Sequence, residues 1–276
     1  MVEPQKGPQG ILYITYGAKY VRAAIHSART ARKHNPGLLI HLFVDAACYE
    51  KFGLAKESGP FSSVGIIERP HRRSKVDYIS QSPFERTLYL DSDTSVAGDI
   101  KDMFDVLDRF DVAACHAMHR NALRKEQVWR EAIPNAFSQF NGGMLLYRRT
   151  PAVQAFLRDW GESYAASGHR HDQITLRELL WQSDLRVYVL PPEYNVRFIK
   201  YRFLWSNAEA VPIIYHLKQY HIGWGGWLWT RVRNGFFGLT NALVMPILRA
   251  VGIKDLRGKQ REAKREARLN QGNKND

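Results

Sequence analysis

The feature that constrains the fold most is a regular alternation of short apolar runs with segments of helical periodicity. Residues 11–16 form a largely apolar run, apolar residues then recur at helical spacing from Val21 to Ala31, and Asn35-Pro36-Gly37 ends that helix. Strands that alternate with helices predict an α/β fold whose sheet is largely parallel and covered on both faces. Further strands are expected at 38–44, 64–67, 87–90, 111–115, 142–147, 186–190 and 211–215, with helices at about 100–107, from Pro151 with Thr150 as its cap, and at 172–181.

Polar residues stand where several of these strands end. Tyr16 is the last residue of the first strand, Asp45 follows the second, and Asp91-Ser92-Asp93 follow the strand at 87–90. Ligands of open α/β sheets bind beyond the carboxyl ends of the strands. We therefore expect these residues to meet at one site although they are far apart in sequence.

Composition excludes some classes of protein and leaves a question about charge. Aromatic residues make up 12% of the 276, and the only cysteines are Cys48 and Cys115, so neither overall disorder nor a disulfide scaffold is expected. The formal net charge is +13. Residues 231–276 hold eleven Lys/Arg and four Asp/Glu, which is more than half of the excess. Such a bias indicates nucleic acid, a phosphate-bearing ligand or an anionic membrane as a partner.

The segment Leu88-Tyr89-Leu90-Asp91-Ser92-Asp93 carries the strongest chemical signal. A buried strand that ends in two carboxylates separated by one residue can turn both toward one cleft. Mg²⁺ and Mn²⁺ are commonly held by one or two carboxylates together with substrate phosphates. Taken alone, the pattern is also typical of a solvated loop with a helix-capping aspartate.

Other segments accompany this motif in a fixed order. Residues 11–20, the strand that ends in Asp45, the 88–93 motif, the run 140–147 with its Asn-Gly-Gly, the pair Asp172-Gln173 and the segment 215–218 follow one another. Together they resemble the GT-A nucleotide-sugar glycosyltransferases, particularly the family 8 type that includes glycogenin and bacterial galactosyltransferases. The resemblance covers about residues 10–220. It implies a Rossmann-like, mixed but mostly parallel sheet flanked by helices.

The resemblance also implies roles for individual residues. Asp91, Asp93 and His216 would hold a Mn²⁺ or Mg²⁺ ion, with His221 as a nearby competitor for the histidine role. The nucleotide-sugar donor would be bound by Tyr16, Gly17, Tyr20, Asp45, Lys75, Asp91, Ser92, Gly142, Gly143 and Lys218. Structural alternatives stay open for several of these: Tyr16 could cover the sheet end, Asp45 could cap a helix, and Lys75 could belong to a basic loop.

Asn141, Asp172 and Gln173 are the residues expected at the transferred sugar. By resemblance, Asn141 and Asp172 would bind sugar hydroxyls, and Gln173 would face the anomeric carbon opposite the leaving phosphate. An amide is no strong base, which favours retention, with the leaving phosphate helping to deprotonate the acceptor. If Asp172 faced the acceptor hydroxyl it could act as the base of an inverting reaction. Asp172 is also a typical helix N-cap.

After His216 the character of the sequence changes, which predicts a catalytic domain at 1–222 and a separate segment at 223–276. The segment contains Trp224-Gly225-Gly226-Trp227-Leu228-Trp229, short apolar runs and the basic end, a composition typical of an interfacial, helical membrane-associating appendage. Alternatively, its apolar part packs on the domain and its end is solvated. No export signal opens the chain and no apolar run is long enough to span a bilayer, so we expect a cytoplasmic protein, peripheral on the inner face of the membrane.

The sequence thus predicts a metal-dependent glycosyltransferase. It would move a sugar from a nucleotide-diphosphate donor, expected to be a UDP-sugar, to a glycan or lipid-linked saccharide in polysaccharide biosynthesis. A sugar nucleotidyltransferase is one alternative, although Tyr16-Gly17-Ala18-Lys19 is not the Gly-rich, Arg-containing loop of such enzymes. A nucleic-acid-binding protein is another, but no recognition motif is present, and we expect no nucleic-acid partner.

Overall fold

The structure is a computed structural model that describes residues 7–55, 59–118 and 127–221. All of them belong to one compact unit, Met1–His221. The predictions made for residues 223–276 lie outside the described residues.

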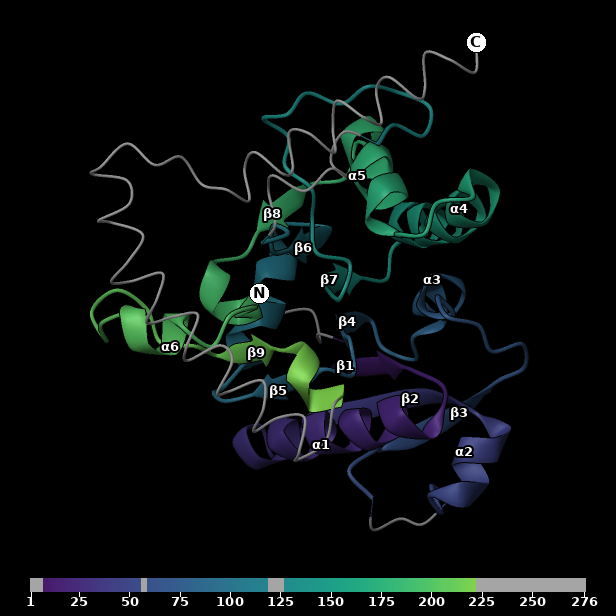
Figure 1. Ribbon diagram of the computed structural model, residues 1–276, viewed down its shortest axis with the longest axis vertical. Helices are drawn as coiled ribbons and strands as arrows, with labels where there is room; N and C mark the ends of the chain where they lie inside the picture. Colours follow the sequence, from purple (N-terminus) through teal and green to yellow (C-terminus); the bar gives the residue numbers. More distant parts are fainter. Residues whose placement is uncertain (1–6, 56–58, 119–126, 222–276) are drawn as a thin grey trace, which may run out of the picture. The chain divides into compact units, whose positions relative to one another are not determined.

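A seven-stranded mixed sheet forms the centre of this unit (Figure 1). Its strand order is β3-β2-β1-β4-β7-β6-β8. The pairs β1·β2, β1·β4, β2·β3 and β6·β8 are parallel, whereas β7 runs antiparallel to both β4 and β6. The strands are β1 Gln9–Ile14, β2 Leu39–Asp45, β3 Ser63–Ile67, β4 Arg86–Leu90, β6 Val112–Ala114, β7 Met144–Arg148 and β8 Val187–Val189. The expected α/β fold with a mostly parallel sheet is therefore confirmed.

The strand order places a topological switch beside the central strand. From β1 the chain moves to β2 and β3 on one side, and then returns to β4 on the other side of β1. In sheets of this kind, the crevice at the carboxyl ends of the two strands that flank such a switch is the usual ligand site. The carboxyl ends of β1 and β4 are followed by Tyr16 and Asp91, so the polar residues singled out from sequence lie at this end of the sheet.

Helices cover both faces of the sheet. On one face lie α1 (Ala18–His34) and the 3-10 helix η2 (Lys101–Asp108); on the other lie α3 (Lys75–Tyr78), α4 (Pro151–Ser167) and α5 (Gln173–Gln182). Thr150 caps α4 as expected, because its side chain accepts a hydrogen bond from the Val153 amide. Short helices of the described residues include α2 (Ala46–Lys51), η1 (Ile79–Gln81), η4 (Pro192–Asn195), α6 (Tyr201–Leu204) and η5 (Lys218–His221).

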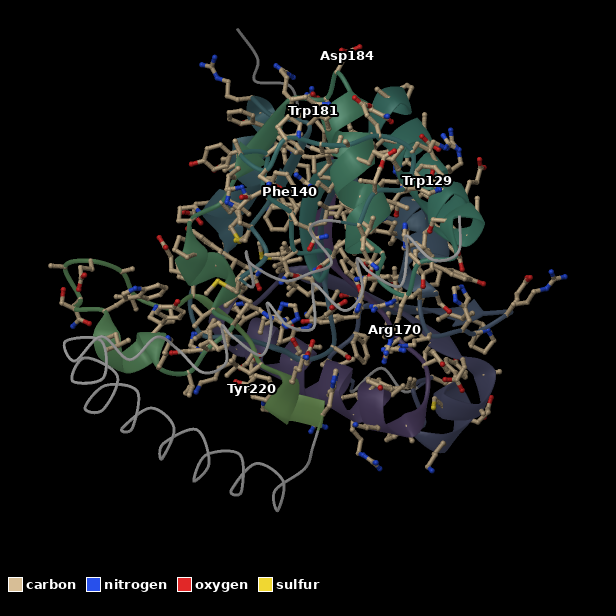
Figure 2. All side chains as sticks on the ribbon, turned by 45° about the horizontal axis from the view of Figure 1, so that its top comes forward. Trp129, Phe140, Arg170, Trp181, Asp184 and Tyr220 are labelled. Atoms are coloured by element: carbon tan, nitrogen blue, oxygen red, sulfur yellow. The ribbon has the colours of Figure 1, made fainter. Side chains whose placement is uncertain are left out.

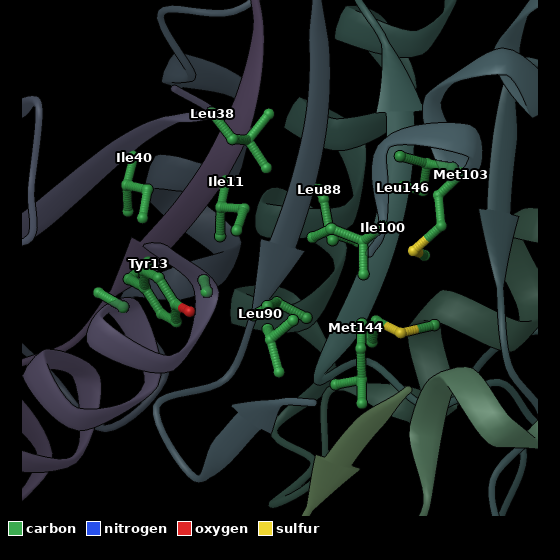
Figure 3. Packing of buried hydrophobic residues seen from close by; sticks show 14 of the residues in the cluster. Ile11, Tyr13, Leu38, Ile40, Leu88, Leu90, Ile100, Met103, Met144 and Leu146 are labelled. Carbon is green, nitrogen blue, oxygen red and sulfur yellow. The ribbon is translucent and has the colours of Figure 1, made fainter. Parts of the chain in front are cut away.

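The core alternates along each central strand because successive side chains of a strand point to opposite faces. In β1, Leu12 and Ile14 pack with α4 and α5, in a cluster that also contains Phe140, labelled in Figure 2. Ile11 and Tyr13 pack with α1 and η2 on the other face (Figure 3). Both faces of β1 are buried, which is why the sequence shows a nearly continuous apolar run there.

A second, two-stranded sheet pairs β5 (Thr94–Val96) with β9 (Ile214–His216) in antiparallel orientation. The prediction missed β5, since three residues are too few to show an alternating pattern. The strand predicted at 211–215 corresponds to β9, which begins later, at Ile214. Pro212 has no N–H to give to a ladder, and the first ladder residue is Ile214. His216 is consequently inside the strand, directly opposite Thr94.

Candidate active site

Asp91, Asp93 and His216 come together at the carboxyl end of β4. One ligand atom from each lies within 4.8 Å of the others. His216 Nε2 is 3.0 Å from Asp93 Oδ1 and 3.7 Å from Asp91 Oδ2. The β5·β9 pairing fixes this approach, because Leu217 N also donates to Asp93 O at 2.8 Å. The three residues predicted to hold a metal therefore lie within reach of a single ion.

The orientation of the His216 ring suits a cation. His216 Nδ1 donates a hydrogen bond to Asn195 Oδ1 at 2.9 Å, which leaves the lone pair of a neutral ring on Nε2, facing the two carboxylates. A lone pair and carboxylate oxygens repel one another unless a positive charge lies between them. A second partner that orients a histidine in this way is a regular feature of metal sites. The donor set of two carboxylates and one imidazole matches Mn²⁺ and accommodates Mg²⁺.

Asp93 is a buried carboxylate close to two histidines and an arginine. Burial alone would raise the pKa of Asp93, but His216, His221 and Arg197 outweigh it and hold the pKa well below its ordinary value. His221 Nδ1 lies 3.9 Å from Asp93 Oδ2, and its Nε2 shares a hydrogen bond of 3.0 Å with Ser92 Oγ. Asp93 is therefore held as an anion, the form that binds a cation.

Asp91 is fixed from three sides. Tyr89 donates its hydroxyl to Asp91 Oδ1 at 2.6 Å, Lys75 Nζ lies 3.6 Å from the same oxygen, and the Asp91 amide donates to Gly143 O at 2.8 Å. Gly143 leaves room that a side chain would fill. A Cβ at this position would lie 2.5 Å from His216 Cε1 and closer still to Asp91 Oδ2. The glycine is thus required for β7 to approach the carboxylate and the imidazole this closely.

Lys75 lies at the centre of a buried charge network. It is 7% exposed, and its Nζ donates to Gly142 O at 2.6 Å and lies 2.8 Å from Asp172 Oδ2. Burial would lower the pKa of Lys75, but Asp172 and Asp91 outweigh it and raise the pKa. Lys75 is therefore a charged residue beside Asp91 and Asp172. The basic-loop alternative for it is excluded.

Asp172 belongs to the same network. It is 2% exposed, and Arg73 lies 3.3 Å from its second oxygen. Burial would raise the pKa of Asp172, yet Lys75 and Arg73 lower it. Although Asp172 precedes α5, its side chain makes no capping hydrogen bond. The helix-cap interpretation of this carboxylate is therefore wrong, and its partners are the cations.

The segment 141–143 runs along this network. Asn141 is buried and its Oδ1 accepts a hydrogen bond from the Gly143 amide at 2.8 Å. A Cβ on Gly142 would lie 2.9 Å from Asp172 Oδ2 and 3.6 Å from Gln173 Cγ. Gln173, partly exposed at the start of α5, is thus a neighbour of Gly142. The residues predicted to surround the sugar lie together.

The residues predicted to bind the nucleoside lie at the end of β1. Gly17 has a φ of 81°, a left-handed conformation that favours glycine. Its amide donates to Asp45 Oδ2 at 2.8 Å, while Asp45 Oδ1 accepts from the Cys48 amide at 2.9 Å. Asp45 is thus the N-cap of α2, and its contact with a nucleotide stays a prediction. Tyr16 is partly exposed there. Tyr20 is 42% exposed and packs edge-on against His221, with ring centroids 4.7 Å apart.

Lys218 was expected to bind the donor, but unlike the buried charges described above it is exposed. It lies in η5, and it forms no ion pair with a carboxylate of the residues that the structure describes. Sequence reasoning missed Asn195, Tyr89 and Arg197. Tyr89 could have been found, since it is two residues before Asp91 on the strand and shares its face. Asn195 and Arg197 carry no local signal and reach the site only through the fold.

This chain is similar to a known protein family and to several solved structures. The sequence model of the nucleotide-diphospho-sugar transferases matches residues 80–223, which contain both aspartates, His216, Asn141 and Gln173. The chain belongs to this family. A search of curated protein sequences finds no match.

Solved structures share the fold of this nucleotide-diphospho-sugar transferase. Galactosyltransferase LgtC in complex with donor and acceptor sugar analogues is 16% identical, with a TM-score of 0.54 over 82% of this chain and 95% of that one. Mouse xyloside xylosyltransferase 1 in its apo form is 15% identical, with a TM-score of 0.51 over 76% and 97%. GlyE of Streptococcus pneumoniae TIGR4 is 20% identical, with a TM-score of 0.52 over 76% and 54%.

The family match and these structures together confirm the predicted resemblance to GT-A glycosyltransferases of the family 8 type. The protein is a transferase with a nucleotide-sugar glycosyltransferase fold. Within the described part of this nucleotide-diphospho-sugar transferase, no helix has the length and apolarity to cross a membrane.

Proposed function

We propose that this transferase is a metal-dependent enzyme that moves a sugar from a UDP-sugar to a glycan or lipid-linked saccharide. One observation carries the proposal. The group Asp91, Asp93 and His216 lies directly beside the glycine pair of 142–143 and the buried Lys75. A cation and a lysine can bind the phosphates of a sugar diphosphate, and glycines let the backbone come close to its sugar.

Asp91, Asp93 and His216 would hold Mn²⁺ or Mg²⁺, with Asn195 orienting the histidine. When bound, such an ion neutralises charge that develops on a leaving diphosphate. Lys75 lies 3.6 Å from Asp91 Oδ1 and adds a fixed positive charge next to the ligands. Preorganised charges of this kind stabilise a transition state without reorganising during the reaction.

The nucleoside and the sugar would occupy opposite sides of the metal ligands. Tyr16, Gly17 and Tyr20 follow β1, where an exposed aromatic ring can stack on a base. Asn141, Gly142 and Gly143 would line the sugar, since their backbone allows close approach and Asn141 offers an amide.

We propose retention of the anomeric configuration. A general base needs access to the acceptor and a pKa near the operating pH. Asp172 is 2% exposed, is held by Lys75 and Arg73, and has a lowered pKa, so it is a poor base for inversion. In the retaining reaction, the bond from the anomeric carbon to the diphosphate oxygen breaks and the bond to the acceptor oxygen forms on the same face. The acceptor proton passes to the leaving diphosphate, and the Gln173 amide takes none.

We propose further that residues 1–222 act as the catalytic domain and that 223–276 bring the enzyme to an anionic membrane surface. The eleven Lys/Arg of residues 231–276 support this placement, because each cation near an anionic leaflet contributes roughly 1 kcal/mol. Vesicle flotation of the full chain and of a chain ending at residue 222 tests it. We expect only the full chain to float with anionic vesicles, and equal flotation of both would contradict the proposal.

A donor screen tests the catalytic proposal. The full chain is incubated with UDP-, GDP-, dTDP- and CMP-sugars, with Mn²⁺, with Mg²⁺ and with a chelator, and release of nucleotide is measured. We expect turnover of a UDP-sugar that requires the metal. NMR of the transferred product should then show the donor's anomeric configuration. An inverted linkage would contradict retention, and metal-independent turnover would contradict the metal site.

A further inference from the structure

Two loops that are far apart in sequence are held side by side at the edge of the site. One precedes α3 and covers residues 68–74; the other joins α4 to α5 and covers residues 168–172. Arg73 and Lys75 connect them through Asp172, at 3.3 and 2.8 Å. The contact continues beneath the loops, where Gly161 of α4 approaches Val76 of α3 so closely that a Cβ would lie 2.9 Å from Val76 O. The relative position of the two loops is therefore fixed by buried contacts.

Three arginines stand exposed on these loops. Arg69 and Arg72 lie on the first loop, and Arg170, labelled in Figure 2, lies on the second. Among the residues that the structure describes, no carboxylate forms an ion pair with any of the three. Asp172 is already engaged by Arg73 and Lys75, and Asp77 by His71. We call Arg69, Arg72 and Arg170 the cationic rim.

Arg73, next to Arg72 on the first loop, carries a buried donor without a partner in the described part of the chain. Arg73 uses a terminal nitrogen for Asp172, but its Nε is buried and has no acceptor among the described residues. A buried donor without a partner is costly to a fold and is commonly satisfied by a bound group. The rim therefore offers exposed guanidinium groups, and the buried Arg73 Nε lies on the same loop as two of them.

The position of the rim relative to the proposed donor site points to the acceptor. Tyr20 and His221 lie on the α1 and β9 side of Asp93, where the nucleoside is proposed to bind. The rim is carried by the loops that precede α3 and α5, and Arg170 lies two residues before Asp172 and three before Gln173. A group bound there would approach the sugar from the side away from the nucleoside.

We propose that the cationic rim is a subsite for an anionic acceptor, a saccharide that carries a phosphate or a carboxylate near its accepting hydroxyl. This inference rests on the proposed function. Guanidinium groups bind phosphate and carboxylate oxygens in pairs, and two or three of them on a fixed frame select such a ligand over its neutral counterpart. The charge also raises the rate of encounter with an anionic acceptor in a manner that salt weakens.

Direct binding tests the rim without requiring turnover. The probes are methyl β-glucoside, its 6-phosphate and the corresponding methyl β-glucuronide, which differ in one group and separate phosphate from carboxylate. Binding to the full chain is measured by ligand-observed NMR at low and high salt. We expect at least one anionic probe to bind about tenfold more tightly than the neutral one at low salt, with the advantage shrinking at high salt.

Charge reversal supplies the second comparison. In the double variant Arg72→Glu and Arg170→Glu, the preference for the anionic probe should disappear, while Arg29→Glu on the exposed side of α1 should preserve it. The double variant Arg72→Gln and Arg170→Gln, in which charge is only removed, should show an intermediate preference. Equal binding of all three probes by the wild type, or an unchanged preference in the double variants, would overturn the proposal.

Donor turnover distinguishes failure of the proposed function from failure of the rim proposal. If the wild type prefers the anionic probe but turns over no nucleotide sugar, the proposed function fails and the rim stands as an anion-binding surface. If it turns over a UDP-sugar and shows no preference, the rim proposal fails alone.

Discussion

His216 Nε2 lies 3.0 Å from Asp93 Oδ1, although one residue follows β4 and the other ends β9. The register of a short antiparallel pair, in which His216 faces Thr94, sets this distance. The three residues after β4 thus include both carboxylates, and β5, which follows them, pairs with the strand that carries His216. The site is built by the fold and not by any one motif.

The first prediction concerns Asn195, which touches the ring of His216 and no carboxylate of the group. In Asn195→Ala the ring loses the partner that holds Nδ1, so Mn²⁺ affinity should fall about tenfold or more. Electron paramagnetic resonance of free Mn²⁺ measures this directly. His216→Ala should lower the affinity further, and an Asn195→Ala protein that binds Mn²⁺ like the wild type would argue against the oriented histidine.

The second prediction concerns Gly143. An added Cβ would meet His216 Cε1 at 2.5 Å and crowd Asp91, so Gly143→Ala should displace both and abolish most Mn²⁺ binding. Gly98→Ala is the matched control, because its Cβ would meet Ile213 at an ordinary 3.5 Å. We expect the control to bind Mn²⁺ normally. Equal metal affinity in the two variants would mean that close approach of β7 is not required.

The third prediction concerns the buried pair Lys75 and Asp172. Lys75→Met leaves the carboxylate with Arg73 alone, and breaking a buried pair from one side typically costs about 3 kcal/mol or more. The double change Lys75→Met with Asp172→Asn should cost less than the sum of the single changes. Urea unfolding of the four proteins completes the cycle. Additive costs would show that the two side chains do not stabilise each other.

The fourth prediction is a pH dependence that arises away from the site, at Asp111. Burial would raise the pKa of Asp111, but the Arg186 amide and the side chains of Arg148 and Arg186 outweigh it and lower the pKa from 3.8 to about 2. Because the folded-state pKa is depressed, this stabilisation is complete above pH 3.8 and is lost as the pH falls toward 2.

Unfolding free energies of wild type and Asp111→Asn should therefore differ by about 2 kcal/mol at most near neutral pH and converge as the solution is acidified. A difference that stayed constant down to pH 2 would assign the effect of the substitution to packing instead of charge.

Much of the frame could be predicted from sequence because its signals are local. The continuous apolar run of β1 and the Thr150 cap of α4 each depend on neighbours in the chain. The Asp-x-Asp motif is equally local. Strand β5 was missed because it is short and its stability comes from a partner far along the chain.

In the site, too, local features could be predicted from sequence and long-range contacts could not. Asp172 could be read as a helix cap from its position, and only the fold reveals Lys75 and Arg73 beside it. Asp45 has the same sequence context before a helix, and there the cap does form. What distinguishes the two aspartates is which loops pack against them, and long-range packing leaves no pattern in a single sequence.

The most direct test of the central claim is nucleotide-sugar turnover as a function of Mn²⁺ concentration in wild type and in Asp93→Asn, which removes one charge from the metal group with little change in shape. The account predicts that wild-type turnover of a UDP-sugar rises with Mn²⁺ and stops with a chelator, and that Asp93→Asn loses turnover by about two orders of magnitude or more. Turnover by Asp93→Asn that matches the wild type, with the same response to Mn²⁺, would contradict it.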